Sequence, residues 1–187
     1  MSKRRRVTVV PQKDKFYQDW CVKQTQSAIN ASDEWSLDTP KPLYAPPAGR
    51  YYTIEVHSIE WYFLQEVRAG QKVSIALSLS YSSRQGKTPF CTQAGDPENL
   101  FWVQYVNDDD SGHGEGEHVT NCHTNRAVLT DDHGFGKLVV GDHLYMQLAT
   151  NQIAHTVPVG LKIQYTFTTV SCSDYVEELA AQLANPS

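Results

Sequence analysis

The chain has 187 residues, of which 40% are hydrophobic, and its formal net charge is −5. This length and composition can supply one ordinary to large hydrophobic core without disulfides or metals, so we expect a single domain. No apolar run is long enough to cross a bilayer, and the basic N-terminal residues are not followed by the hydrophobic segment of a secretory signal. We therefore expect no membrane insertion and a reducing cell interior.

The cysteines fit that compartment. Cys21, Cys91, Cys122 and Cys172 are far apart and form no C-x-x-C pair, so the sequence indicates neither a structural zinc site nor a thioredoxin-like motif. We expect buried free thiols.

Residues 1–49 are interpreted as an N-terminal arm and an extended leader. Lys3, Arg4, Arg5 and Arg6 form a dense cationic block, which suits phosphate binding or nuclear import as well as it suits a solvated tail. Between Lys13 and Trp35 the spacing of the aromatic residues predicts one or two helical turns. The proline-rich stretch up to Gly49 then predicts an extended leader.

Residues 50–172 read as consecutive strands with no long helix between them. The apolar phase shifts by one residue between Val56 and Ile59, which predicts a β-bulge or a bend near Ser58. Gly70 is expected to turn the chain into a strand over 73–81, and a short strand is expected around 101–106.

Alternation is cleanest in the last third of the strand region. Apolar side chains share one face from Leu144 to Leu148 and again from Val159 to Phe167, with polar residues opposite. We expect seven to nine strands, each with one solvent-exposed face. They predict an all-β fold that forms a single jelly-roll antiparallel β-sandwich. Residues 173–187 should add a short amphipathic helix, with Asp174-x-x-Glu177 as a capping pair and an apolar face of Val176, Leu179, Ala180 and Leu183.

Three polar clusters are candidates for chemical sites. The acidic stretch 107–118 fails the EF-hand spacing and is better explained as an exposed loop than as a calcium, zinc or iron site. Cys122 and His123 would point to opposite faces of a strand, which rules out a catalytic pair. Asp131, Asp132 and His133 have no accompanying nucleophile, so turn chemistry explains them. We expect no enzyme activity, no catalytic residue, no metal and no cofactor.

Aromatic residues leave a further alternative open. Trp35, Trp61, Trp102 and ten tyrosines could form a sugar platform, but a sandwich core or an assembly interface would use them equally well. A glycan-binding, lectin-like β-sandwich is therefore the alternative function.

The last third resembles the capsid proteins of small circular single-stranded DNA viruses that encode a replication initiator. The resemblance lies in residues 131–147, which hold a Gly-x-Gly turn, a short strand, an aspartate turn and a strand ending in aromatic-x-Gln, and in residues 160–167 and 174–176. It covers about 50 residues, with weaker support from residues 54–79.

This resemblance implies a structural protein whose copies, about 60 in the smallest shell, enclose the genome. It also implies an inward-facing basic arm, here Lys3, Arg4, Arg5 and Arg6, as the nucleic-acid-binding residues. The expected partners are further copies of the chain, viral single-stranded DNA and a host receptor whose identity the sequence does not give. The expected location is the virion and, during assembly, the host cell interior, with the nucleus as one option.

The arm departs from the family pattern, because related arms are longer and more basic. About 60 copies would bring roughly 240 arm cations, whereas encoding this chain alone takes roughly 560 nucleotides with one charge each. The remaining genome charge would need counterions or further cations, for which Lys13, Lys15 and Lys23 are candidates. The acidic stretch 107–118 is expected outside the shell.

Overall fold

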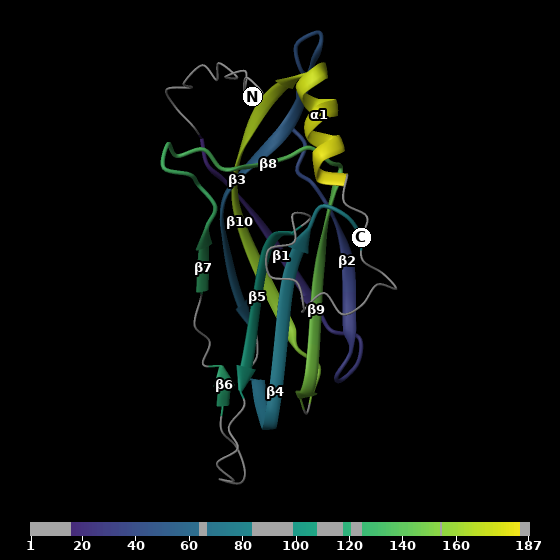
Figure 1. Cartoon of the computed structure of the whole chain (residues 1–187), viewed down its shortest axis with the longest axis vertical. Coiled ribbons are helices and arrows are strands. Elements are labelled where there is room, and N and C mark those ends of the chain that lie inside the picture. Colours follow the sequence, from purple (N-terminus) through teal and green to yellow (C-terminus); the bar gives the residue numbers. More distant parts are fainter. Residues whose placement is uncertain are drawn as a thin grey trace, which may run out of the picture.

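The computed structural model describes residues 16–63, 67–83, 99–107, 118–120, 125–153 and 155–183. These form two antiparallel sheets packed face to face and one C-terminal helix (Figure 1). The strands in chain order are β1 (Gln18–Thr25), β2 (Ser32–Asp38), β3 (Arg50–Phe63), β4 (Val67–Ser80), β5 (Asn99–Asn107), β6 (His118–Thr120), β7 (Asn125–Val128), β8 (Lys137–Val139), β9 (His143–Ile153) and β10 (Pro158–Ser171), followed by α1 (Cys172–Leu183).

The strands pair in a nested order, from the two ends of the chain inward, as in one long β-hairpin. β1 pairs with β10, β2 with β9, β3 with β7 and β8, and β4 with β5 and β6. Rolling this long hairpin brings β10 beside β3 and β9 beside β4, which gives the sheet orders β1-β10-β3-β7 and β2-β9-β4-β5. This is the jelly roll, so the predicted fold class is confirmed.

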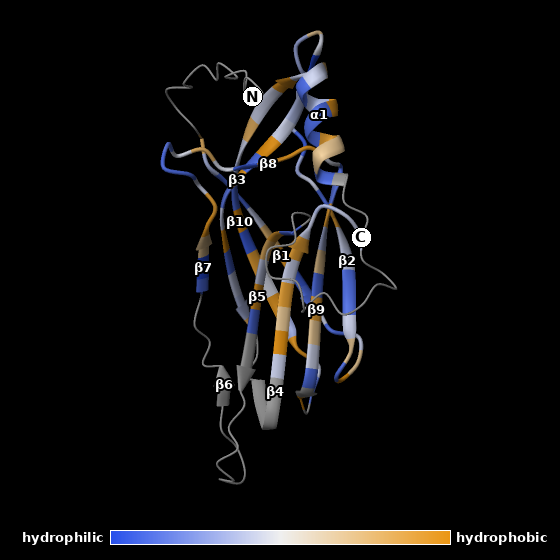
Figure 2. Cartoon of the chain, viewed as in Figure 1, coloured by the Kyte–Doolittle hydropathy of each residue, from blue (hydrophilic) through white to orange (hydrophobic). Residues whose placement is uncertain are grey.

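The core lies between the two sheets and follows the predicted alternation. Along β9 the apolar side chains at 144, 146 and 148 are fully buried, as are those at 159, 161 and 163 of β10. Figure 2 shows the corresponding change from orange to blue along these strands. Because the sheets bury one face each, period-2 patterns in the sequence were sufficient to locate them.

The predicted irregularity near Ser58 is confirmed as a β-bulge in β3. Gln164 of β10 pairs with Ser58, but Tyr165 pairs with Val56, so His57 is the extra residue. The extra residue lets Ile59 and Val56 both face the core, which regular pairing could not do.

Two expectations for the N-terminal half are wrong. Residues 18–38 are not an appendage with helical turns, because β1 and β2 are strands of the two sheets. Val22 and Leu37 contribute to the core, so two-residue alternation overrode the helical spacing of the aromatic residues. Gly70 does not turn the chain: it lies within β4, whose register against β9 is irregular between Ala69 and Ser74.

Two cysteines also differ from the expectation. Cys21 and Cys172 are free but exposed, because Cys21 lies on the outer face of β1 and Cys172 at the start of α1. Cys91 and Cys122 lie outside the described residues. Among the helices of the described chain, none is long and apolar enough to span a bilayer.

Candidate functional site

One end of the sandwich carries a groove, which we call the end groove. The leader between β2 and β3, the start of β3, the turn between β8 and β9, Phe167 of β10 and Tyr175 of α1 line it, and its volume is about 410 Å³. Figure 1 shows this end at the top, where α1 and the β2–β3 connection meet.

The leader is fixed to the opposite wall of the groove. The Thr39 N–H donates to the Asp142 carbonyl (2.9 Å), and the Thr39 hydroxyl donates to the Gly141 carbonyl (2.9 Å). The Lys41 ammonium lies 2.9 Å from the Asp142 carboxylate, whose hydrogen bond and charge raise the pKa of Lys41. Both side chains are well exposed, so this ion pair orients the rim but adds little stability.

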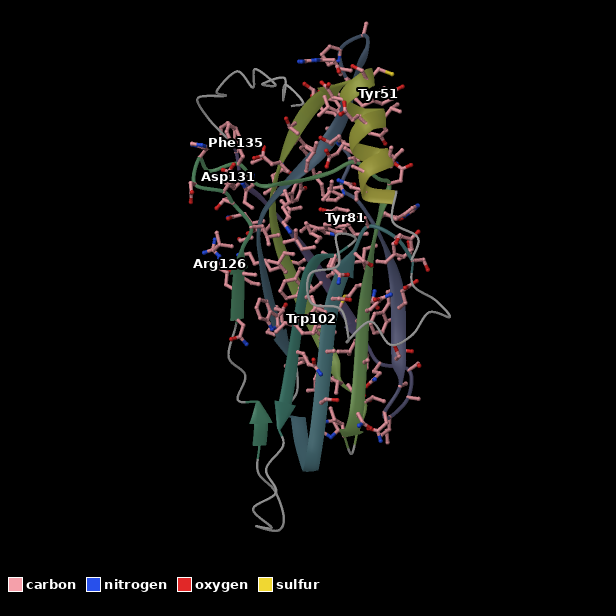
Figure 3. All side chains as sticks on the ribbon, viewed as in Figure 1. Tyr51, Tyr81, Trp102, Arg126, Asp131 and Phe135 are labelled. Atoms are coloured by element: carbon pink, nitrogen blue, oxygen red, sulfur yellow. The ribbon has the colours of Figure 1, made fainter. Side chains whose placement is uncertain are left out.

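Aromatic rings form the floor and one wall of the end groove. Tyr51 and Tyr175 stack at a tilt of 31° with ring centroids 4.7 Å apart, which joins β3 to α1. Figure 3 shows Tyr51 beside the first turns of α1. The Phe167 ring packs edge-on against Tyr165 at 5.4 Å and against Tyr52 at 6.5 Å. These ring contacts give the groove a preformed aromatic part, beside polar groups such as Lys41 and Asp142.

Large apolar side chains are exposed to solvent at the same end. Leu43 is 96% exposed and Tyr44 80%, and these two neighbouring residues are called the leader ridge. Val176 of α1 and Tyr51 of β3 are also exposed. The sequence interpretation missed this surface, although two large apolar residues between prolines, outside any periodic pattern, were a visible signal.

The predicted C-terminal helix is present as α1, but its cap and its inward face differ from the prediction. The Asp174 N–H donates to Ser171 Oγ (3.2 Å), and the Ser171 hydroxyl donates to the Asp174 carboxylate (2.7 Å). The cap is therefore Ser171 with Asp174, not Asp174 with Glu177, because the helix starts at Cys172.

The inward face of α1 contains Tyr175, Glu178, Leu179 and Gln182, whereas Val176 and Ala180 are exposed. Gln182 is buried: its amide Nε2 donates to the Leu138 carbonyl (2.8 Å), and the Val140 N–H donates to its Oε1 (3.4 Å). These bonds to the β8 segment rotate the helix away from the apolar face that periodicity alone predicts.

The turn after β7 is docked on the β-bulge. Asp131 Oδ1 accepts hydrogen bonds from the N–H groups of His133 and Phe135 (both 2.9 Å), and the bond from Phe135 chiefly lowers the pKa of this carboxyl. The Gly136 N–H donates to Glu55 Oε1 (2.7 Å). The interpretation of this cluster as turn chemistry is confirmed.

The outer face of the β1-β10-β3-β7 sheet carries both signs of charge. Lys162 lies 3.2 Å from Asp19, and Arg126 lies 3.8 Å from Glu60. Lys23, a candidate for further phosphate neutralisation, is exposed on β1 of this sheet. The described part of the face is therefore mixed in charge rather than a basic patch.

Several predicted site residues lie outside the described residues. They are Lys3, Arg4, Arg5 and Arg6, Lys13 and Lys15, residues 108–117 of the acidic stretch, and the pair Cys122 and His123. The strand ends Asn107 and His118, which flank the acidic stretch, belong to the end of the sandwich opposite the end groove. Within the described residues, no three His, Cys, Asp or Glu side chains are grouped so as to hold a metal ion.

The tryptophans do not form an exposed platform in the described part of the chain. Trp61 is buried against Phe101, with ring centroids 4.8 Å apart, and Trp35 and Trp102 are half-buried. Trp61 is thus a core residue, and the solvent-facing aromatic surface near the end groove comes from tyrosines.

No protein-family model matches the chain, and no curated protein matches its sequence. Among solved structures, the chain is similar to VP1 of Trichodysplasia spinulosa-associated polyomavirus in complex with GM1 oligosaccharide, with a TM-score of 0.52 and 10% identity over 87% of this chain and 97% of that one. It also matches VP1 of New Jersey polyomavirus (TM-score 0.43, 11% identity, 83% of this chain and 100% of that one). A further match is human polyomavirus 12 VP1 in complex with 3'-sialyllactosamine (TM-score 0.46, 9% identity, 82% and 100%).

Proposed function

We propose that this chain is a structural coat protein whose copies assemble into a small icosahedral shell around a single-stranded DNA genome, without catalysis. The observation that carries the proposal is the fold: a jelly roll that aligns with a viral capsid protein over 87% of this chain and 97% of the other. The virion is the corresponding location.

The sandwich suits this role as a rigid building block. The core described between its two sheets comes from one chain, and α1 is fixed to the β8 segment through Gln182. Subunit contacts would then use loops and ends, where the leader ridge exposes apolar area. Individually weak contacts of this kind are multiplied by closed symmetry.

Genome binding is assigned to Lys3, Arg4, Arg5 and Arg6. The support is chemical, because clustered guanidinium groups bind phosphates bidentately and release counterions. Single-stranded DNA is chosen on the resemblance of residues 131–147 to capsid proteins of that virus class. Digestion of the packaged nucleic acid with strand-specific and sugar-specific nucleases tests this choice.

The acidic stretch 107–118 is placed outside the shell. Its flanking strands end opposite the end groove, and a stretch with so many carboxylates is best solvated there. If chelation dissolved the shell and calcium rebuilt it, the stretch would instead be a cation-binding subunit junction.

A glycan-binding module remains the second candidate, on one observation. Tyr44 and Tyr51 present exposed rings at the rim of a preformed groove, which is a geometry that can stack on sugars. The two functions differ in oligomeric state, since a lectin would stay a monomer or small oligomer.

Negative-stain microscopy of the purified chain separates the candidates directly. The coat-protein proposal expects uniform spherical particles. A field without particles, together with saturable binding to a glycan array, would favour the lectin instead.

A further inference from the structure

The leader ridge is an unusual surface for a loop. Leu43 and Tyr44 are adjacent, and both side chains are almost wholly in water. Pro42 and Pro46 flank them, which restricts φ at these positions and removes backbone donors. The prolines therefore restrict the backbone of the exposed ridge. Ordering that backbone in an interface would cost little conformational entropy.

The apolar area at this end is comparable to the largest apolar patch of a typical monomer, and such patches are often functional. At the exposures of Leu43, Tyr44, Tyr51 and Val176, side chains of these sizes present on the order of 500 Å². Two such surfaces pressed together would bury roughly 1,000 Å², the lower limit for a specific protein interface. One chain alone supplies only half of that area.

This end of the chain carries both an exposed ridge and a groove. Leu43 and Tyr44 of the ridge border a groove of about 410 Å³. The rest of its lining includes the aromatic rings of residues 51, 52, 167 and 175. In an isologous contact the same patch of each subunit faces the other. Each subunit must therefore carry both the ridge and the groove.

The charges favour another apolar protein surface over other occupants. The groove's Lys41 and Asp142 neutralise each other. A nucleic acid would therefore find no excess of positive charge at this rim. A sugar stacked on the tyrosines would leave Leu43 in water.

We propose that the leader ridge of one copy inserts into the end groove of a second copy, and the reverse, in a two-fold contact. The proposal rests on the proposed function of self-assembly and names one of its contacts. In this contact Leu43 and Tyr44 would pack on the rings of Tyr52 and Phe167 of the other copy.

The test compares the double variant Leu43→Ser/Tyr44→Ser with Ile29→Ser, which removes an exposed apolar side chain in the turn between β1 and β2. Sedimentation velocity over a concentration series measures association, and circular dichroism checks the fold. We expect the double variant to shift the association midpoint at least tenfold to higher concentration, with Ile29→Ser unchanged. Association of the double variant at the wild-type midpoint would overturn the proposal, while wild-type particles would still uphold the coat function.

Two further outcomes separate the inference from the function it rests on. Wild-type dimers that depend on the ridge, but never grow into shells, would support the contact and contradict the coat function. A wild-type chain that stays monomeric at all concentrations would contradict both.

A photo-crosslinking residue at position 43 gives an independent measurement that does not depend on the serine variants. Dimer-sized products should carry crosslinks to the peptides that contain Tyr52 or Phe167. Crosslinks confined to other surfaces of the second copy would overturn the ridge-in-groove contact.

Discussion

Gly136 shows how a single residue can fix the position of a turn against a sheet. A Cβ atom added there would lie 2.3 Å from the Val56 carbonyl oxygen and 3.0 Å from His57 Nδ1. Only the missing side chain lets the turn approach the β3 bulge closely enough for the hydrogen bond to Glu55.

Replacing this residue tests the close approach. Gly136→Ala should lower the free energy of unfolding by roughly 2 kcal/mol or more, because backbone atoms must move to accommodate the methyl group. Gly141→Ala is the matched control, since its nearest contact would be at 3.4 Å. Equal midpoints of the two variants in urea would show that the turn is not held at the bulge.

Tyr81 links stability to alkaline pH. Burial, aided by the charge of Glu178 on α1, raises the pKa of Tyr81 from 10.0 to about 12. Below pH 10 both the folded and unfolded states keep the proton, so the contribution is fully present. Between pH 10 and 12 only the unfolded state loses it, so stability falls as pH rises.

Between pH 10 and 12 the free energy of unfolding of the wild type should fall with pH by up to about 1.4 kcal/mol per pH unit because of Tyr81. Tyr81→Phe should lack this part of the fall. Thermal unfolding at a series of pH values measures this difference, with Tyr44→Phe as the control at an exposed tyrosine. Parallel pH profiles for Tyr81→Phe and wild type would contradict the burial of this hydroxyl under α1.

At the scale of elements, buried hydrogen bonds help to hold the helix α1. Gln182 is the link, because it satisfies the Leu138 carbonyl and the Val140 N–H at a place where water is excluded. The helix thereby positions Tyr175 against Tyr51.

Gln182→Ala should cost about 1–3 kcal/mol, because it leaves buried backbone groups without partners. Glu177→Ala, on the exposed side of the same helix, should be close to neutral. Hydrogen exchange of the α1 amides would show faster opening only in the first variant. Similar exchange in both variants would mean that α1 is held by its apolar contacts alone.

The elements differ in how far sequence could predict them. The strands β9 and β10 and the bulge at His57 were predictable, because one buried face imposes a period of two and a phase shift requires an extra residue. The strands β1 and β2 were not, because partly exposed strands such as these have a weak apolar pattern that the spacing of Phe16, Tyr17 and Trp20 obscured. The end groove joins residues from five segments of the chain, so no local pattern could reveal it.

For the whole molecule, nucleic-acid binding by the arm can be tested separately from particle formation by the sandwich. Deleting residues 1–10 should lower the nucleic-acid content of purified particles while the particles persist, because it removes the cationic block and leaves every described strand intact. The ratio of absorbance at 260 and 280 nm measures that content. An unchanged ratio would remove Lys3, Arg4, Arg5 and Arg6 from the nucleic-acid-binding residues.

Closure of many identical jelly rolls into one shell is the central claim, and the mass of the native assembly tests it most directly. About 60 copies of a 21.1 kDa chain give a protein shell of roughly 1.3 MDa. Charge-detection mass spectrometry of native material should show one narrow population at that protein mass plus any packaged nucleic acid. A spectrum with only the 21.1 kDa chain, or a broad ladder without a closed species, would contradict the account.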